Sequence, residues 1–488
     1  MPLLIVVFDG LRPDAVAPGS MPALSAFLRD ALVFSRASTV FPSETRVAAA
    51  TVATGCYPET HGMVGNAIYV PAIEPASLLN TGDAAVMDRM ESVLGKVLDT
   101  PSLGEILARH GKSLAVASGG STGSCRLLHH KASALGAYRY SLHGASFCAA
   151  PEQFAHAESA LGTVPAVSCP SRDRNAYLAR VFITQVLPLR PEVALLWFTD
   201  PDYTGHYRGL RAPAHAGALR SVDENFAHIL RALAEEEKKG KAPWNILTAS
   251  DHGQIPLCGG VDPRESILGP EGRRLRDRLA QAGFGLNIED RGKQPVVLVK
   301  PGRCAEFFVS GGEQEAAGEI LSAFFAEQDW VGALIENTEK PSPFSLPSSL
   351  PRAGHPAAPL LRLTPISVPG PGGTRAALDG PNSVFASHGG LEREETRILL
   401  ALRGSGIEPG VSGAACGLVD IAPSALALTG VPVPEHMHGQ PLPHCPDKEG
   451  VKETLHAVPC RPDLALRLRF RGGRSYPDCL VHGEGGAQ

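Results

Sequence analysis

Four short polar motifs of this 488-residue sequence, three after apolar segments and one before such a segment, carry Asp or His residues of the kind that bind divalent metals. These residues are Asp9, Asp202, His206, Asp251, His252 and His388. Each motif alone is also consistent with a helix cap, a polar turn or a loop. Together they supply mixed oxygen and nitrogen ligands that exceed the need of one tetrahedral ion and fit two. The sequence therefore predicts two divalent metals, with zinc favoured and manganese or iron as alternatives.

The spacing within two of these motifs supports shared coordination. Asp202 and His206 are four positions apart, so one helical turn would place both on one face. Asp251 and His252 are adjacent, and both can reach one ion only where the backbone leaves the sheet. Gly253 allows that change of direction with little strain.

A hydroxyl nucleophile is expected in residues 41–55, where a Pro-containing loop meets a helix of small residues. A hydroxyl in the first helical turn lies among free backbone N–H groups and at the positive end of the helix dipole, which together form an anion site. Ser43 and Thr45 are both candidates, and either could instead be an N-cap. The capping explanation is stronger for Ser43 than for Thr45.

Five apolar segments are typical of buried strands, and helical patterns lie between them. The strands are expected at residues 3–8, 113–118, 193–199, 245–249 and 397–402, and the helices at 22–32, 45–54, 103–110, 175–187, 216–237 and 420–428. This alternation predicts an α/β fold with a mostly parallel central sheet flanked by helices. Ligands bind beyond the carboxyl ends of such strands, so the polar motifs would meet at one sheet edge.

Changes in composition and in the strand and helix patterns divide the chain into four parts. Residues 1–258 and 380–440 form the two parts of a catalytic α/β core, and residues 259–379 form an inserted, smaller α+β cap. Within the cap we expect a strand at 296–300, a helix at 313–327 and a loop over the Pro-, Ser- and Gly-rich run 341–373. Residues 441–488 are a C-terminal tail, with one strand expected at 464–470.

Composition excludes several classes of protein. The formal net charge of -5 gives no basic footprint for a nucleic-acid polymer. The ten cysteines contain no Cys-x-x-Cys pair and are expected to be reduced thiols. The apolar run at the N-terminus is too short for a signal peptide, and no stretch is long enough to span a bilayer, so we expect a cytoplasmic protein with no membrane partner.

Five motifs, in order along residues 3–440, resemble those of one known family. They are VFDGLRPD at 7–14, TGCYPETHGMVGN at 54–66, PDYTGH at 201–206, SDHG at 250–253 and SHG at 387–389. The sequence is similar to the alkaline phosphatase superfamily in its type I phosphodiesterase/nucleotide pyrophosphatase branch, and also to phosphonoacetate hydrolase. Each motif is short, but their joint match makes chance a poor explanation. The resemblance implies an alkaline-phosphatase-like fold.

The resemblance also implies roles for individual residues. It assigns one metal to Asp9, Asp251 and His252 together with the nucleophile, and the other to Asp202, His206 and His388. In that family the nucleophile precedes the Thr of the Thr-Gly motif by nine residues, which selects Thr45 and makes it a metal ligand as well. Asn66 matches the family Asn that donates a hydrogen bond to a non-bridging phosphoryl oxygen.

The function implied is a two-metal hydrolase of phosphate esters, best described as a phosphodiesterase/nucleotide pyrophosphatase that forms a phospho-threonine intermediate. The substrate is expected to be a small phosphate ester, with a nucleotide as a candidate, and the oligomeric state is open between monomer and homodimer. Arg46 departs from the family pattern and could either contact substrate phosphate or lie on the helix surface. The Cys-x-Pro-x-Arg signature of sulfatases is absent around Thr45.

Three alternatives stay open at this stage. A carbon–phosphorus hydrolase would need a cation for its substrate carboxylate, for which Lys112, Arg126 and Lys131 are candidates. A phosphomonoesterase of the same superfamily would use the same ligands. An inactive metal- or phosphate-binding scaffold would retain them without turnover.

Four aromatic residues are candidates for contacts with the substrate's leaving group. Phe41 could line a leaving-group pocket, since it is next to the nucleophile loop, or it could be part of the core. Tyr69, Tyr203 and Tyr207 could stack a nucleobase or be buried.

Overall fold

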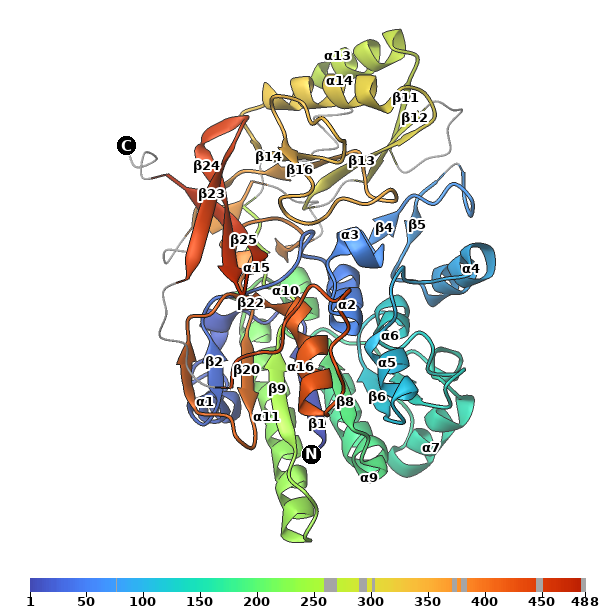
Figure 1. Cartoon of the computed structure of the whole chain (residues 1–488), viewed down its shortest axis with the longest axis vertical. Coiled ribbons are helices and arrows are strands. Elements are labelled where there is room, and N and C mark those ends of the chain that lie inside the picture. Colours follow the sequence, from blue (N-terminus) through green and yellow to red (C-terminus); the bar gives the residue numbers. More distant parts are fainter. Residues whose placement is uncertain are drawn as a thin grey trace.

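An eight-stranded sheet forms the centre of the molecule in this computed structural model, which describes residues 1–75, 77–258, 270–288, 296–300, 303–370, 375–378, 384–444 and 451–483. The strands are, in spatial order, β21 (Gly410–Ser412), β2 (Leu32–Phe34), β20 (Leu400–Arg403), β9 (Asn245–Ala249), β1 (Leu3–Phe8), β8 (Val193–Phe198), β6 (Leu114–Ser118) and β7 (Tyr138–Ser141). Only β20 runs antiparallel to both of its neighbours. The predicted α/β fold with a mostly parallel sheet is confirmed (Figure 1).

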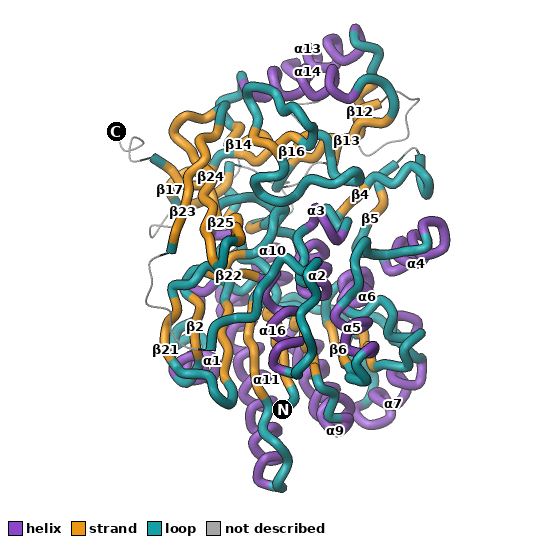
Figure 2. The backbone as a smooth tube through the Cα atoms, viewed as in Figure 1, coloured by secondary structure: helices purple, strands orange, loops and turns teal. Residues whose placement is uncertain are grey.

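The central strands are apolar throughout because both faces of the sheet are covered. All six residues of β1 are buried, and they alternate between two cores: Leu3, Ile5 and Val7 in one, Leu4, Val6 and Phe8 in the other. The first core also receives α2 (Thr45–Thr54), α5 (Leu103–Arg109) and α16 (Ile421–Leu428). The second receives α1 (Pro22–Arg29), α8 (Arg172–Val181) and α11 (Pro213–Lys238) (Figure 2). This is the doubly covered parallel arrangement.

Further helices and small sheets surround these layers. They include α3 (Pro58–His61), α4 (Ala84–Leu94), α6 (Thr122–Leu128), α7 (Pro151–Leu161), α9 (Leu187–Leu189), α10 (Asp202–Arg208) and α15 (Arg393–Thr396). Four two-stranded sheets pair β3 (Ala37–Ser38) with β22 (Cys416–Gly417), β4 (Ala67–Ile68) with β5 (Leu79–Asn80), β10 (Ile255–Pro256) with β19 (Ala386–Ser387), and β17 (Ser367–Pro369) with β18 (Arg375–Ala377).

A second sheet lies in the upper part of Figure 1, and its strands fall between β10 and β19 in sequence. Its order is β11 (Gly285–Ile288), β12 (Val296–Lys300), β13 (Ala305–Ser310), β16 (Leu361–Pro365), β14 (Val331–Glu336) and β15 (Leu346–Pro347). It is accompanied by α13 (Pro270–Gln281) and α14 (Gln314–Ala326). The strand expected at 296–300 and the helix expected at 313–327 are both present. The domain boundaries themselves stay a prediction, and residues 259 and 379 lie outside the described residues.

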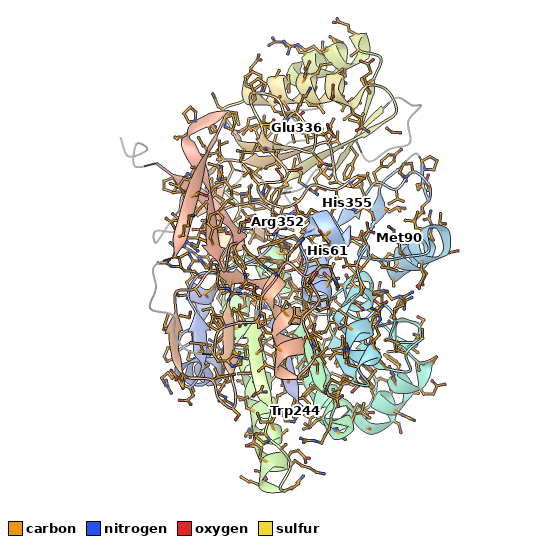
Figure 3. The ribbon with its side chains drawn as sticks, viewed as in Figure 1. His61, Met90, Trp244, Glu336, Arg352 and His355 are labelled. Atoms are coloured by element: carbon orange, nitrogen blue, oxygen red, sulfur yellow. The ribbon has the colours of Figure 1, made fainter. Side chains whose placement is uncertain are left out.

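The second sheet packs against two loops of the main domain, the one before α2 and the one after α3. Arg362 of β16 pairs with Glu306 of β13 at 2.9 Å, donates to the Val64 carbonyl and places its guanidinium 5.7 Å from the centre of the Phe41 ring. Figure 3 labels further contacts between the two parts: Arg352 and His355 lie near His61 and α3. Arg352 binds Glu59 at 2.6 Å, so α3 is fixed from the side of the second sheet.

Three sequence-based predictions of secondary structure were wrong. The helix expected over residues 22–32 ends at Arg29, and Leu32 begins β2, because β20 and β21 supply pairing partners from far along the chain. The strand expected at 397–402 begins only at Leu400. The run 341–373 is not all loop, since it contains β15, β16 and β17.

The segment after residue 440 contains more structure than the single strand expected. β23 (Lys452–Val458), β24 (Arg461–Arg471) and β25 (Arg474–His482) form a three-stranded antiparallel sheet. Among the described residues, the nine cysteines form no disulfide. None of the helices described is both long enough and apolar enough to cross a bilayer.

Candidate active site

Three neighbouring strands each deliver a carboxylate at their carboxyl ends. Asp9 follows β1, Asp251 follows β9, and Asp202 begins α10 soon after β8. Because β1 lies between β8 and β9 and all three run parallel, these ends meet at one edge. The predicted convergence of the motifs at one sheet edge is therefore present.

His388 reaches the same edge from a different element. It follows β19, which pairs antiparallel with β10 just after His252. Since β20 runs antiparallel to β9, the segment that precedes β20 starts at the edge where β9 ends.

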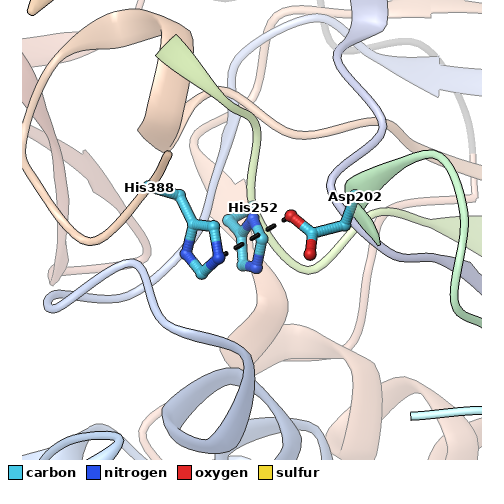
Figure 4. A group of neighbouring side chains, drawn as sticks. All are labelled: Asp202, His252 and His388. Atoms are coloured by element: carbon cyan, nitrogen blue, oxygen red, sulfur yellow. Dashed lines mark ion pairs between the residues drawn. The ribbon is translucent and has the colours of Figure 1, made fainter. Parts of the chain in front are cut away.

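His252 lies at the centre of the cluster. Its Nε2 is 3.1 Å from Asp251 Oδ2 and 3.6 Å from Asp9 Oδ1, and its ring stacks on His388 with centroids 3.6 Å apart. His388 Nε2 lies 3.6 Å from Asp202 Oδ1 (Figure 4). Two groups of three therefore share His252, one with Asp9 and Asp251 and one with Asp202 and His388, and in each the ligand atoms lie within 4.8 Å of one another.

His206 completes the set of predicted ligands. It lies one turn after Asp202 on α10, with Nε2 3.2 Å from Asp202 Oδ2 and its ring centroid 5.1 Å from that of His388. All six predicted ligands are thus in one cluster. Their division into two sets of three stays a prediction, because His252 is close to members of both sets.

The three histidines are oriented in the same way. Each places Nδ1 within hydrogen-bond distance of a backbone carbonyl, at 2.7 Å for His206, 2.9 Å for His252 and 2.7 Å for His388. A ring that donates Nδ1–H keeps an unprotonated Nε2 with a free lone pair. This is the arrangement that outer hydrogen bonds impose on metal-binding histidines.

Asp9 and Asp251 each accept a hydrogen bond through only one of their two carboxylate oxygens. Asp9 accepts the Trp197 indole N–H at 3.0 Å through Oδ2, and Asp251 accepts the Gly10 N–H at 2.9 Å through Oδ1. The other oxygens, Asp9 Oδ1 and Asp251 Oδ2, are buried without a hydrogen-bond donor. Buried anionic oxygens without donors need a cation. The residues present therefore fit divalent metal ions.

The pKa values of the buried side chains also indicate that the cluster favours a positive charge. Burial raises the pKa of Asp9 well above its ordinary value, and Asp251 and Asp202 raise it further. Burial opposes protonation of His252, yet Asp251, Asp202 and Asp9 raise its pKa to about 10. Burial and the neighbouring His252 lower the pKa of His388 to about 3. The surrounding carboxylates thus favour the protonated, positively charged form of the His252 imidazole. A bound metal cation would supply the same positive charge.

Thr45 and Ser43 have different surroundings. Thr45 is the first residue of α2, is 7% exposed, and places Oγ1 3.2 Å from His252 Nε2. The Ser43 hydroxyl is fully buried, donates to the Gly390 carbonyl at 2.9 Å and accepts the Gly389 N–H at 2.9 Å. The hydroxyl that faces the ligand cluster is therefore that of Thr45.

Asn66 lies beside the loop that precedes Thr45. Its backbone N–H donates to the Glu44 carboxylate, immediately before Thr45, and its carbonyl accepts the Thr81 N–H at 3.1 Å. The Asn66 side-chain Oδ1 is buried without a hydrogen-bond partner. The structure thus places Asn66 near Thr45, while its role toward a phosphoryl oxygen stays a prediction.

Comparison with known proteins gives the family. The model of the type I phosphodiesterase/nucleotide pyrophosphatase family matches residues 3–320. The chain belongs to this family. The predicted resemblance is confirmed.

Curated relatives match over a short segment. The bis(5'-adenosyl)-triphosphatases enpp4 of Mus musculus and ENPP4 of Bos taurus and Homo sapiens are 34% identical over 67 residues, which is 14% of this chain. The match spans only 15% of the length of those relatives.

Solved structures match over nearly the whole fold. Murine ectonucleotide pyrophosphatase/phosphodiesterase 5 superposes with a TM-score of 0.57 at 15% identity, covering 89% of this chain and 97% of that one. Its inactive T72A variant in complex with AMP gives the same TM-score and identity, with 96% of that chain covered. These likenesses establish the fold of this member of the phosphodiesterase family.

Several secondary candidates do not reach the site of this family member. Lys112 precedes β6, at the opposite edge of the sheet. Arg126 is bound to Asp88 at 3.1 Å and to Glu91 at 3.2 Å, and Lys131 also pairs with Glu91. These three were the expected carboxylate-binding cations of a carbon–phosphorus hydrolase, so the structure gives that alternative no support.

Of the four aromatic candidates, Phe41 and Tyr69 take part in packing contacts, and the other two lie together on α10. Phe41 is 1% exposed and packs in a cluster with Cys304 and Leu391, so it is a core residue. Tyr69 donates to Ser310 Oγ at 2.7 Å and belongs to the contact with the second sheet. Tyr203 and Tyr207 lie on α10 with ring centroids 5.0 Å apart.

Sequence reasoning missed the residues that orient the ligands. Trp197 and Gln254, which donates to Asp202 Oδ1, were not singled out. Trp197 begins the motif that contains Asp202 and His206, but no role was predicted for its indole. A Trp at the end of a buried strand is itself a signal, because its N–H needs an acceptor. Gln254 directly follows the Asp-His-Gly motif but carries no such signal.

Proposed function

We propose that this protein is a metal-dependent hydrolase of phosphoric esters, of the phosphodiesterase/nucleotide pyrophosphatase type, with Thr45 as its nucleophile. The observation that supports it best is the contact of Thr45 Oγ1 with His252 Nε2 at 3.2 Å, inside a cluster of buried carboxylates and imidazoles. Family membership supports the same class of reaction.

Six residues would hold two divalent cations: Asp9, Asp202, His206, Asp251, His252 and His388. When bound, the cations would lower the pKa of the Thr45 hydroxyl and neutralise charge on the phosphoryl oxygens. The donor set of carboxylate oxygens and imidazole nitrogens favours zinc, with manganese or iron as alternatives.

The chain itself contributes the nucleophile and its setting. Thr45 opens α2, whose N-cap residue Glu44 makes no side-chain capping bond, so the first-turn N–H groups are left to face an anion. Thr45 Oγ1 would lose its proton and attack phosphorus, forming a new P–O bond while the bond to the leaving oxygen breaks; the leaving oxygen departs with the electron pair and takes up a proton from water. Asn66 would donate a hydrogen bond to a non-bridging oxygen. Water then cleaves the phospho-threonine and restores the hydroxyl.

The binding partner proposed is a small phosphate ester. A nucleotide is the leading candidate, because a structural neighbour is described in complex with AMP. A cytoplasmic location is proposed as well, on the sequence features given above.

A panel of three substrates tests this proposal. Purified protein would be assayed with zinc or manganese against bis-p-nitrophenyl phosphate, p-nitrophenyl phosphate and phosphonoacetate. Hydrolysis of the first, abolished by a chelator and restored by metal, is expected. Turnover of phosphonoacetate alone would replace the proposal with a carbon–phosphorus hydrolase, and bound metal without turnover of any ester would indicate an inactive scaffold.

A further inference from the structure

Arg46 follows the nucleophile directly in the first turn of α2, and nothing in the mechanism above uses it. The side chain is partly buried, and burial lowers its pKa although Glu44, Asp9 and Asp202 raise it. An arginine stays charged under these conditions. A positive charge therefore lies within electrostatic range of two predicted metal ligands and beside Thr45.

The guanidinium of Arg46 has no partner in the part of the chain that the structure describes. Its Nε is buried without a hydrogen bond, and neither an ion pair nor a hydrogen bond joins its terminal nitrogens to a described residue. Nε is thus a buried donor without an acceptor, on the residue that directly follows Thr45. A ligand oxygen beside Thr45 would supply that acceptor.

The protein makes room for this side chain on its outer side. Arg46 Nη2 packs over Gly82, where an added Cβ would come within 3.1 Å of it. Asn80, which ends β5, accepts the Gly82 N–H at 2.9 Å and holds this turn in place. The side chain is thus held on one side by this turn, with an unpaired donor beside the proposed nucleophile.

We propose that Arg46 binds an anionic phosphoryl oxygen of the substrate, and that it selects substrates with more than one negative charge at or next to the reacting phosphorus. This inference rests on the proposed function and deepens it. A simple diester carries one charge, which the metals and Asn66 would already compensate. A guanidinium fork gains most from an additional anionic oxygen, because charge-assisted bidentate bonds are strong.

The additional charge could come from two sources. It is on the reacting phosphorus itself in a phosphomonoester, and on the adjacent phosphorus in a pyrophosphate-linked nucleotide. The shared chemistry is a polyanionic phosphoryl ligand, and the assay separates the two sources by substrate.

The test compares Arg46→Ala and Arg46→Lys with wild type on three substrates: bis-p-nitrophenyl phosphate, p-nitrophenyl phosphate and a dinucleoside pyrophosphate. Arg46→Ala is expected to lower kcat/KM about 10- to 100-fold on at least one polyanionic substrate, and by clearly less on the diester. Arg46→Lys should restore only part of the loss, since it retains the charge without the fork. Arg29→Ala, which removes an exposed arginine at the end of α1, is the matched control.

Equal losses on all three substrates with unchanged metal content would overturn the proposal and indicate a structural role. No loss on any substrate would overturn it as well. Calorimetric titration with inorganic phosphate provides a readout independent of turnover: Arg46→Ala should weaken binding, and unchanged binding would contradict the inference. If wild type hydrolyses none of the esters, the proposed function fails, while the phosphate titration still decides whether Arg46 binds an anion.

Discussion

The hydroxyls of Ser43 and Thr45 are only two residues apart, but they contact different groups. Ser43 bridges the backbone at Gly389 and Gly390, while His388 Nδ1 contacts the Ser43 carbonyl. Thr45 makes its side-chain contact with His252. From the sequence alone both were candidates for the nucleophile, because composition does not reveal which hydroxyl is enclosed by a partner loop.

Ser43→Ala tests this separation at the scale of one residue. Loss of the hydroxyl leaves a buried donor and a buried acceptor unpaired, so the free energy of unfolding should fall by about 1–3 kcal/mol. Turnover of a phosphate ester should persist within about tenfold, since Thr45 is untouched. Chemical denaturation and a steady-state assay measure both quantities. Loss of all turnover in a folded, metal-containing Ser43→Ala protein would instead make Ser43 the nucleophile.

At the scale of elements, the turn after β1 determines how close two predicted ligands lie. Gly10 has φ +67°, and a Cβ added there would come within 2.7 Å of Asp202 Cβ. Gly10→Ala should therefore strain the turn and displace α10, weakening metal binding and costing more than the roughly 1 kcal/mol of the backbone conformation alone.

Gly111→Ala is the matched control for that substitution. Gly111 also has φ +67°, but nothing lies within 4 Å of its added Cβ. The difference between the two variants in unfolding free energy and in metal content isolates the clash with Asp202. Equal losses of unfolding free energy and of metal content in both variants would contradict a contribution from the close contact between residue 10 and Asp202.

The elements that the sequence could predict are those whose pattern is local and strong. The continuous apolar runs of β1 and β8 and the small-residue helix α2 are examples, and α2 was predicted at the residues observed. Strand β16 was missed because its apolar residues lie inside a Pro-, Ser- and Gly-rich run and its partners β13 and β14 are distant in sequence. Pairing across such distances leaves no local signal.

At the scale of the molecule, a buried arginine of the second sheet joins that sheet to the main domain. Arg362 binds Glu306 and the Val64 carbonyl, two residues before Asn66. Arg362→Ala leaves a buried carboxylate without this partner, so we expect a loss of about 3–5 kcal/mol in unfolding free energy, together with lower turnover.

A double variant provides the control for that ion pair. Replacing both partners by apolar residues, as in Arg362→Met with Glu306→Leu, should recover much of the stability, because a buried pair is often replaced at little cost. Denaturant titration of the two variants measures this. No difference between single and double variants would contradict the assignment of the loss to the missing Arg362–Glu306 ion pair.

Metal removal should also affect the whole molecule. Three carboxylates converge at the site, and two of their oxygens are buried without donors. A chelator should lower Tm and abolish ester hydrolysis, and added zinc should raise Tm in a concentration-dependent way, as binding to the folded state alone requires. Asp251→Asn should reduce this response. A chelator-treated protein with unchanged Tm and activity would contradict a metal site here.

The sequence could predict which residues come together at the sheet edge, but not how they are oriented. Asp9, Asp202 and Asp251 were recognisable because each follows a strand of one parallel sheet. The carbonyl contacts that orient the histidines through Nδ1 come from loops whose paths depend on tertiary packing. The contact of the second sheet with the nucleophile loop joins segments about 300 residues apart, and no local pattern indicates it.

The most direct test of the central claim is the rate of phosphate-ester hydrolysis by Thr45→Ala protein that contains as much metal as wild type. With the nucleophile removed and the ligand cluster intact, kcat should fall by about 1000-fold or more, whereas Thr45→Ser should retain measurable turnover. Metal content is determined on the same samples by elemental analysis. Turnover by metal-replete Thr45→Ala at the wild-type rate would contradict the account.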